Sequence, residues 1–128
     1  MRSIVLLVED HQDTRQMYAE FMAPTFDILE AGTGTKALQV MSGRTPHLVV
    51  TDVSLPDIDG FELIARMRRD PKLAGVPVIC LSGYGGHAHE ERAKEFQCER
   101  LLQKPCLPDT LTHAVAAVLS TPRRPPMS

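Results

Sequence analysis

The chain has 128 residues, which accommodates a single domain with one hydrophobic core and is too short for two. Its net charge of -2 offers no general attraction to nucleic acid or anionic membranes, so we expect neither direct nucleic-acid binding nor membrane insertion. No apolar run approaches the roughly 20 residues that span a bilayer, and the apolar start is too short for a signal peptide, so we expect a cytoplasmic protein.

Five short apolar stretches recur along the chain. These predict β-strands at Ile4–Val8, Phe26–Leu29, Leu48–Val50, Val76–Leu81 and Leu101–Leu102. They show little alternation between polar and apolar residues, which is typical of strands buried on both faces of a parallel sheet.

The segments between the strands carry apolar residues at three- and four-residue spacing, as one face of a helix does. This spacing predicts helices around Met17–Met22, Ala37–Met41 and Phe61–Met67, a weaker helix from about His87, and a last one over Leu107–Leu119. Pro108 stands where first-turn prolines are common. The sequence therefore contains five strand–helix units.

Alternating strands and helices predict an α/β fold with a parallel five-stranded sheet. Because crossovers are right-handed, few topologies remain, and we predict the flavodoxin-like doubly wound (βα)5 sandwich of strand order 2-1-3-4-5. The domain is expected to cover residues 1–120. Residues 121–128, which are rich in proline and arginine, are expected to form a disordered or extended tail.

Polar residues follow the predicted strand ends: Glu9 and Asp10 after the first, Asp52 after the third, Ser82 after the fourth and Lys104 after the fifth. In the predicted sheet these side chains meet at one edge. Three carboxylates repel one another unless a cation lies between them, and oxygen ligands without thiolate suit Mg²⁺ or Mn²⁺. A carboxylate in that setting can attack phosphorus and form an aspartyl phosphate.

These motifs together resemble the receiver domain of two-component response regulators. The resemblance rests on "VEDH", "DVSLPDIDG", "CLSGYG" and "QKP", in this order, and covers the chain up to about Leu119. It implies Asp52 as the phosphoacceptor, with Ser82 and Lys104 binding the phosphoryl group.

The same resemblance implies a metal site and partners. Asp10 and Asp52 would ligate Mg²⁺ directly, Glu9 would act mainly through metal-bound water, and Ser54 would add a backbone carbonyl. The phosphoryl donor would be a histidine of a sensor histidine kinase or a histidine phosphotransfer protein, and an unidentified downstream protein would read the signal. We expect Mg²⁺-dependent self-phosphotransfer and autodephosphorylation without turnover of an independent substrate, so the chain is not expected to be an enzyme. Whether the last helices pair in a weak homodimer stays open.

Three further positions are expected to modulate the site. Receivers usually carry Tyr or Phe three residues before the lysine, but this chain has Leu101, so a swing of an aromatic ring cannot be its readout. Tyr84, two residues after the hydroxyl, is hypothesised to shield the phosphoryl group. Pro105 follows Lys104, and an X-Pro bond that is cis would aim the lysine back across the sheet edge.

Several nearby polar residues have simpler interpretations. Asp57 and Asp59 lie in a loop before the predicted third helix, and we assign them turn and capping roles. Asp10 with Glu9 can also be interpreted as a turn and helix N-cap. His87 and His89 are two residues apart, so on a helix they would not share a face as a metal pair.

Three other functions compete with phosphoacceptance. A haloacid-type Mg²⁺ phosphatase needs a second acid two residues after its nucleophile, where this chain has Ser54. A flavin carrier needs a first loop that cradles phosphate, and the acidic "VEDHQD" would repel it. A receiver-like scaffold that binds a partner without phosphorylation is the remaining alternative, and Leu101 keeps it open.

Overall fold

The computed structural model describes residues 2–83 and 86–121, and within these ranges strands and helices alternate. The strands are β1 (Ile4–Val8), β2 (Asp27–Ala31), β3 (Leu48–Asp52), β4 (Val78–Ser82) and β5 (Arg100–Gln103). All neighbouring pairs are parallel, and the order in the sheet is β2-β1-β3-β4-β5. This confirms the predicted topology.

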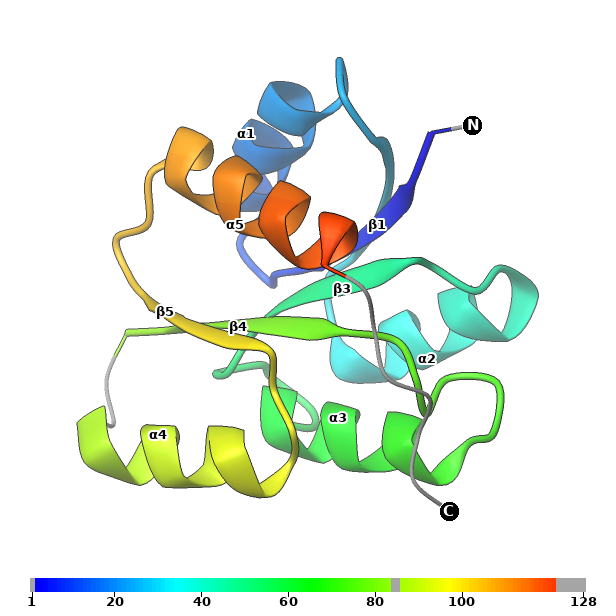
Figure 1. Ribbon diagram of the computed structural model, residues 1–128, viewed down its shortest axis with the longest axis vertical. Helices are drawn as coiled ribbons and strands as arrows, with labels where there is room; N and C mark the ends of the chain where they lie inside the picture. Colours follow the sequence, from blue (N-terminus) through cyan, green and yellow to red (C-terminus); the bar gives the residue numbers. More distant parts are fainter. Residues whose placement is uncertain (1, 84–85, 122–128) are drawn as a thin grey trace.

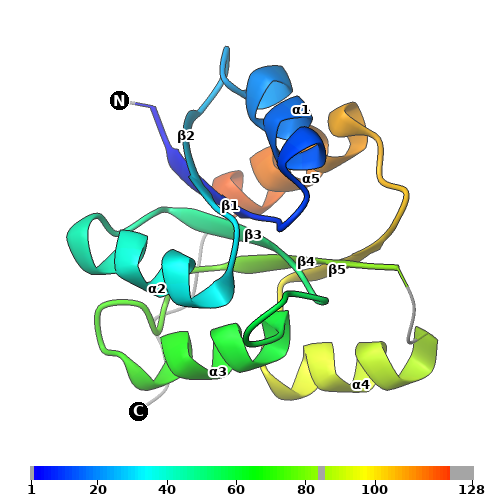
Figure 2. The ribbon, with the colours of Figure 1, turned by 180° about the vertical axis from the view of Figure 1, so that it is seen from behind.

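Helices cover both faces of the sheet. They are α1 (Gln12–Met22), α2 (Gly34–Gly43), α3 (Gly60–Arg69), α4 (Gly86–Glu95) and α5 (Pro108–Ser120). Helices α1 and α5 lie on one face, and α2, α3 and α4 lie on the other (Figures 1 and 2), so the predicted doubly wound sandwich is confirmed. Among residues 2–83 and 86–121, no helix has the length and apolar character needed to cross a lipid bilayer.

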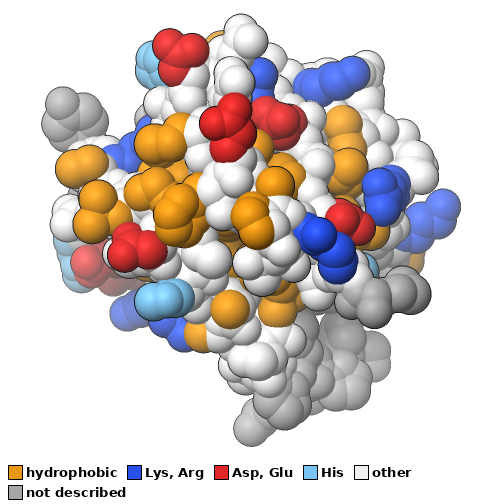
Figure 3. Space-filling view, turned by 90° about the horizontal axis from the view of Figure 1, so that it is seen from above, with side chains coloured by type: hydrophobic (Ala, Val, Ile, Leu, Met, Phe, Trp, Pro, Cys, Tyr) orange, Lys and Arg blue, Asp and Glu red, His pale blue; other side chains and the backbone are white. Residues whose placement is uncertain are grey.

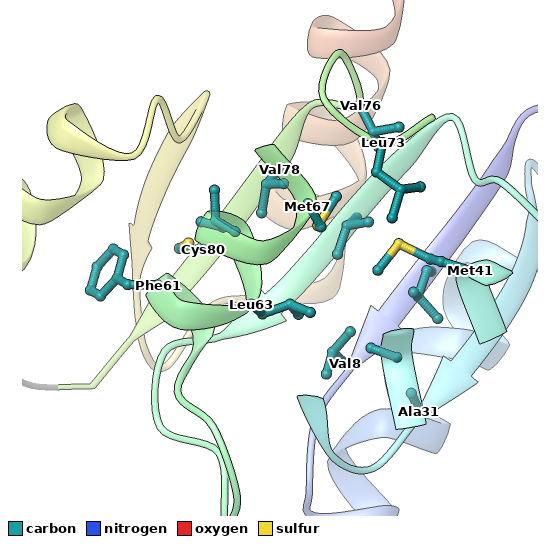
Figure 4. Packing of buried hydrophobic residues seen from close by; sticks show 14 of the residues in the cluster. Val8, Ala31, Met41, Phe61, Leu63, Met67, Leu73, Val76, Val78 and Cys80 are labelled. Carbon is teal, nitrogen blue, oxygen red and sulfur yellow. The ribbon is translucent and has the colours of Figure 1, made fainter. Parts of the chain in front are cut away.

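The core is divided by the sheet into two apolar layers because successive strand residues point to opposite faces. In β1, Leu6 and Val8 enter the layer below α2 and α3, whereas Val5 and Leu7 enter the layer below α1 and α5. Figure 4 shows the first layer, in which Phe61 is fully buried. Burial on both faces explains why the strands are apolar throughout.

Three strand starts differ from the prediction: those of β2 and β4 lie later in the chain, and β5 begins one residue earlier, at Arg100. Strand β2 begins at Asp27 because Phe26 packs into the layer below α1 and α5, and its N–H bonds to the carbonyl of Met22 at the end of α1. Strand β4 begins at Val78 because Val76 belongs to a turn, where its carbonyl accepts a hydrogen bond from Arg68 Nη1 at 2.8 Å. Apolar character alone does not separate a strand residue from a buried residue in a turn. The predicted tail lies outside the described residues from 122 onward.

Side chains of the loops hold the starts of α2 and α3. Asp59 caps α3 by accepting a hydrogen bond from Glu62 N at 2.8 Å, as its position predicted. Asp57 instead reaches the start of α2, where it accepts bonds from the N–H groups of Gly34 at 3.0 Å and Thr35 at 2.9 Å. The bonds from Thr35 lower the pKa of Asp57 well below its usual range. Asp10 caps nothing; the N-cap of α1 is the following residue, so the capping interpretation of the acidic pair is wrong.

Candidate functional site

The polar residues predicted at the strand ends do lie along one edge of the sheet. In Figure 1 the carboxyl ends of the strands point to the left. Strand register places Asp52 beside Leu81 and Ser82 beside Gln103, so the ends of β3, β4 and β5 are neighbours. Glu9 follows β1, and Lys104 follows β5.

Lys104 joins the two buried carboxylates of this edge. Its Nζ donates hydrogen bonds to Asp52 Oδ2 at 2.7 Å and to Glu9 Oε1 at 3.1 Å. Asp52 and Glu9 are only 5% and 4% exposed, so neither charge is solvated by bulk water. Partial burial by itself would lower the pKa of Lys104, but its hydrogen bonds to Asp52 and Glu9 outweigh that effect and raise it. The lysine therefore stays charged at neutral pH.

At this edge of the sheet, the carboxylates of Glu9, Asp10 and Asp52 outnumber the one ammonium group, that of Lys104. Burial raises the pKa of Glu9, and its hydrogen bond to Asp10 and the charge of Asp52 raise it further. The N–H of His11, which donates to Glu9 Oε2 at 3.3 Å, partly offsets this. A carboxylate whose ionisation is opposed in this way is favoured by an additional cation.

The oxygen ligands of this edge suit a hard divalent ion. One ligand atom from each of Glu9, Asp10 and His11 lies within 4.8 Å of the others, which makes these three the candidate metal group among residues 2–83 and 86–121. The two carboxylates match the chemistry expected for Mg²⁺. The side chain of His11 is 76% exposed, and its Nδ1 lies 3.8 Å from Asp10 Oδ1.

Asp52 and Ser54, the other predicted metal ligands, are placed differently. The Asp52 carboxylate is not part of the group of three; its Oδ1 accepts a hydrogen bond from Ser54 N at 3.3 Å, and its Oδ2 binds Lys104. Ser54 itself is exposed. The metal roles of Asp52 and of the Ser54 carbonyl therefore stay predictions.

The loop after Asp52 packs closely against it, which explains the glycine that begins α3. A Cβ atom on Gly60 would lie 2.6 Å from the carbonyl oxygen of Asp52, inside contact distance. The N–H of Gly60 also bonds to the carbonyl of Val53 at 2.8 Å. Glycine at this position thus allows α3 to start directly beside the acceptor.

Ser82 makes a contact that the sequence analysis missed. Its Oγ lies 2.5 Å from Nδ1 of His89 in α4, and Ser82 is only 5% exposed. The sequence suggested no role for His89, because it does not share a helix face with His87 as a metal pair would. His87 is exposed and lies 3.3 Å from Glu91. His89 lies seven positions after Ser82 in the sequence, and no helical or strand periodicity predicts their contact.

The three modulating positions have different outcomes. Leu101 is partly buried against the core and pairs in register with Cys80, so an aliphatic side chain does occupy this place in β5. The peptide bond between Lys104 and Pro105 is cis. Tyr84 lies outside the described residues, and its shielding role stays a hypothesis.

Apolar side chains are exposed beside the site. Met17 and Phe21 of α1 are 43% and 49% exposed, and Leu107 is 66% exposed. Met17 and Leu107, together with Lys104, line a surface cavity of about 570 Å³. Figure 3 shows hydrophobic side chains gathered on the face seen from above. This arrangement is typical of a surface that contacts another protein.

Comparisons with known proteins agree with this geometry. A family model described as the response regulator receiver domain matches residues 5–116. The polar-differentiation response regulator DivK of Brucella ovis is 26% identical over 106 residues, covering 82% of this chain and 86% of DivK. Histidine kinase P4 of Formosa agariphila is 29% identical over 104 residues, covering 81% of this chain and 8% of the kinase. The solved signal receiver domain of a signal transduction histidine kinase from Syntrophus aciditrophicus has a TM-score of 0.85 at 25% identity, covering 98% of this chain and 97% of that one.

Proposed function

The chain belongs to the response regulator receiver domain family, and from this we propose that it is a switch that accepts a phosphoryl group on Asp52. The observation that carries the proposal is the buried Asp52 carboxylate bonded to the Lys104 ammonium at 2.7 Å. A nucleophilic carboxylate needs a fixed cation close by, because charge develops on the phosphoryl oxygens during transfer.

In the proposed transfer, an Asp52 oxygen forms a bond to phosphorus while the bond from phosphorus to the donor breaks, and the bonding electrons leave with the donor. Lys104 keeps its charge and shifts one hydrogen bond to a phosphoryl oxygen, and the Ser82 hydroxyl donates to another. Glu9, Asp10 and Asp52, with the Ser54 carbonyl, would hold Mg²⁺, which supplies further charge neutralisation. These residues act once on their own chain and need no independent substrate.

We propose that the donor is a histidine of a sensor kinase or of a phosphotransfer protein. The exposed side chains of Met17 and Leu107 support this, because they line the same surface cavity as Lys104. A docking protein that covers them would bring its histidine close to Asp52 and exclude water. A downstream protein would then bind the phosphorylated form.

The experiment is an intact-mass spectrum after incubation with acetyl phosphate and Mg²⁺. We expect one added phosphoryl group in the wild type and in the control variant Asp70→Asn, whose carboxylate lies after α3. We expect none in Asp52→Asn or with EDTA. An adduct that persists in Asp52→Asn would refute the assignment of the acceptor.

The alternative function is a scaffold that binds its partner without phosphorylation, and Leu101 at the usual aromatic position favours it. Absence of any adduct in the wild type, together with failure to bind beryllofluoride, would support this alternative.

A further inference from the structure

The contact between Ser82 and His89 joins the phosphoacceptor edge to a helix. Ser82 ends β4, and His89 lies in the first half of α4. Their Oγ and Nδ1 atoms are 2.5 Å apart, and both residues are at least partly screened from water. Any displacement of the Ser82 hydroxyl therefore changes a bond to α4.

A serine hydroxyl carries a single proton, whereas phosphoryl oxygens act only as acceptors. To bind a phosphoryl group on Asp52, Ser82 has to donate that proton. If the proton is donated to Nδ1 of His89, it is not available to the phosphoryl oxygen. In the tautomer whose Nδ1 carries no proton, the imidazole and the phosphoryl group therefore compete for the same hydrogen-bond donor.

The imidazole is held in place by aromatic side chains. The rings of His89 and of Phe61 in α3 pack edge to face, with ring centroids 5.6 Å apart and an interplanar angle of 67°. Phe61 is fully buried and stacks on Phe96 at 6.2 Å, and the guanidinium of Arg92 lies 4.8 Å from the Phe61 centroid. Figure 4 shows Phe61 at one end of the buried layer, beside Cys80. The position of His89 is thus coupled to the packing of α4 on α3.

We propose that His89 is a positioning residue that holds the Ser82 hydroxyl in the unphosphorylated protein. When the acceptor carries a phosphoryl group, the hydroxyl donates to it instead, and the bond that ties α4 to β4 is lost. The inference rests on the proposed phosphorylation of Asp52 and adds the route by which it is read. The loss of this bond would give the chain a readout that requires no aromatic residue at position 101, where this chain has Leu101.

Ring-nitrogen spectra of the ¹⁵N-labelled wild-type protein test this directly, with beryllofluoride and Mg²⁺ as the probe. We expect the Nδ1 resonance of His89 to move on addition of beryllofluoride, and that of His87 on the same helix to stay in place. In Ser82→Ala, the His89 resonance should already differ from the wild type without the probe. These spectra need no variant of His89 to fold.

The outcomes separate this inference from the proposed function. If beryllofluoride binds, as monitored by its fluorine resonances, and the His89 resonance does not move, the inference is overturned while the proposed function stands. If beryllofluoride does not bind, the proposed function fails and the inference fails with it.

A double-mutant cycle tests whether His89 acts through the hydroxyl. Removing the competing acceptor in His89→Ala should tighten beryllofluoride binding by about fivefold, the range of one net hydrogen bond. The same substitution in a Ser82→Ala background should have no effect, and His87→Ala should have none in either background. A tightening that persists without the Ser82 hydroxyl would show a merely structural effect and overturn the inference.

Discussion

Two halves of the phosphoacceptor edge are held by different forces. In the carboxylate half, Glu9 and Asp52 share the Lys104 ammonium in buried ion pairs. In the hydroxyl half, one hydrogen bond joins Ser82 to His89. Breaking a buried ion pair by removing one partner costs about 3–5 kcal/mol, whereas exchanging one neutral hydrogen bond for another costs about 1 kcal/mol or less. The carboxylate half therefore suits groups that keep their positions during the reaction, and the hydroxyl half suits a group that changes its hydrogen-bond partner.

Backbone hydrogen bonds hold the loop of the carboxylate half in place. After Asp52, the chain is bound to its neighbours by the bonds from Val53 N to the Leu81 carbonyl and from Gly60 N to the Val53 carbonyl. Asp57 then fastens the loop to α2. In the hydroxyl half, the N–H of Lys104 donates to the Ser82 carbonyl at 2.9 Å, and the Ser82 side chain contacts His89 of α4, a contact that can change without breaking the sheet.

The largest expected effect is a difference between the two halves in how strongly a substitution slows phosphorylation. We expect Lys104→Met to slow phosphorylation by acetyl phosphate by about 100-fold, because a charged donor to the reacting oxygens is lost. Ser82→Ala removes a neutral donor and should slow it by about tenfold. The measurement is the time course of the intact-mass adduct, with the exposed Lys36→Met as the control. Equal slowing in Lys104→Met and Ser82→Ala would contradict the different roles assigned to the two halves.

A second prediction concerns the close packing behind the carboxylate half. Gly60→Ala should lower the free energy of unfolding by about 2 kcal/mol, because the new methyl group meets the backbone of Asp52, which cannot move aside easily. Gly43→Ala is the matched control, since its Cβ would have no atom within 4 Å, and it should be neutral or stabilising. Urea denaturation gives both values. Similar destabilisation by the two substitutions would contradict the rigidity assigned to this loop.

The smallest expected effect is a pH dependence in the loop of the carboxylate half. Because the folded state lowers the pKa of Asp57, its carboxylate stabilises the protein above the usual pKa of about 3.8, and this contribution is lost as the pH falls toward the folded-state value. Asp57→Asn should therefore be less stable than the wild type at pH 7. The difference should shrink below about pH 4 in urea titrations repeated from pH 7 to pH 3. A difference that is constant over this range would show that the charge of Asp57 does not contribute.

The sheet order, and with it most of the site, could be predicted from the sequence. Apolar runs and helical spacing separate strands from helices, and the right-handed crossover leaves few ways to arrange five units. Once the order is known, Asp52, Ser82 and Lys104 must meet, because the carboxyl ends of neighbouring parallel strands lie at the same edge.

The contacts that depend on how the helices pack on the sheet are seen in the structure and could not be predicted from the sequence. His89 reaches Ser82 because Phe61 and Phe96 set the position of α4, and Asp57 reaches α2 because of the path of its loop. Phe26 and Val76 look like strand residues in the sequence but are buried outside the strands. Such contacts join residues from different elements through the direction of single side chains, which neither spacing nor composition encodes.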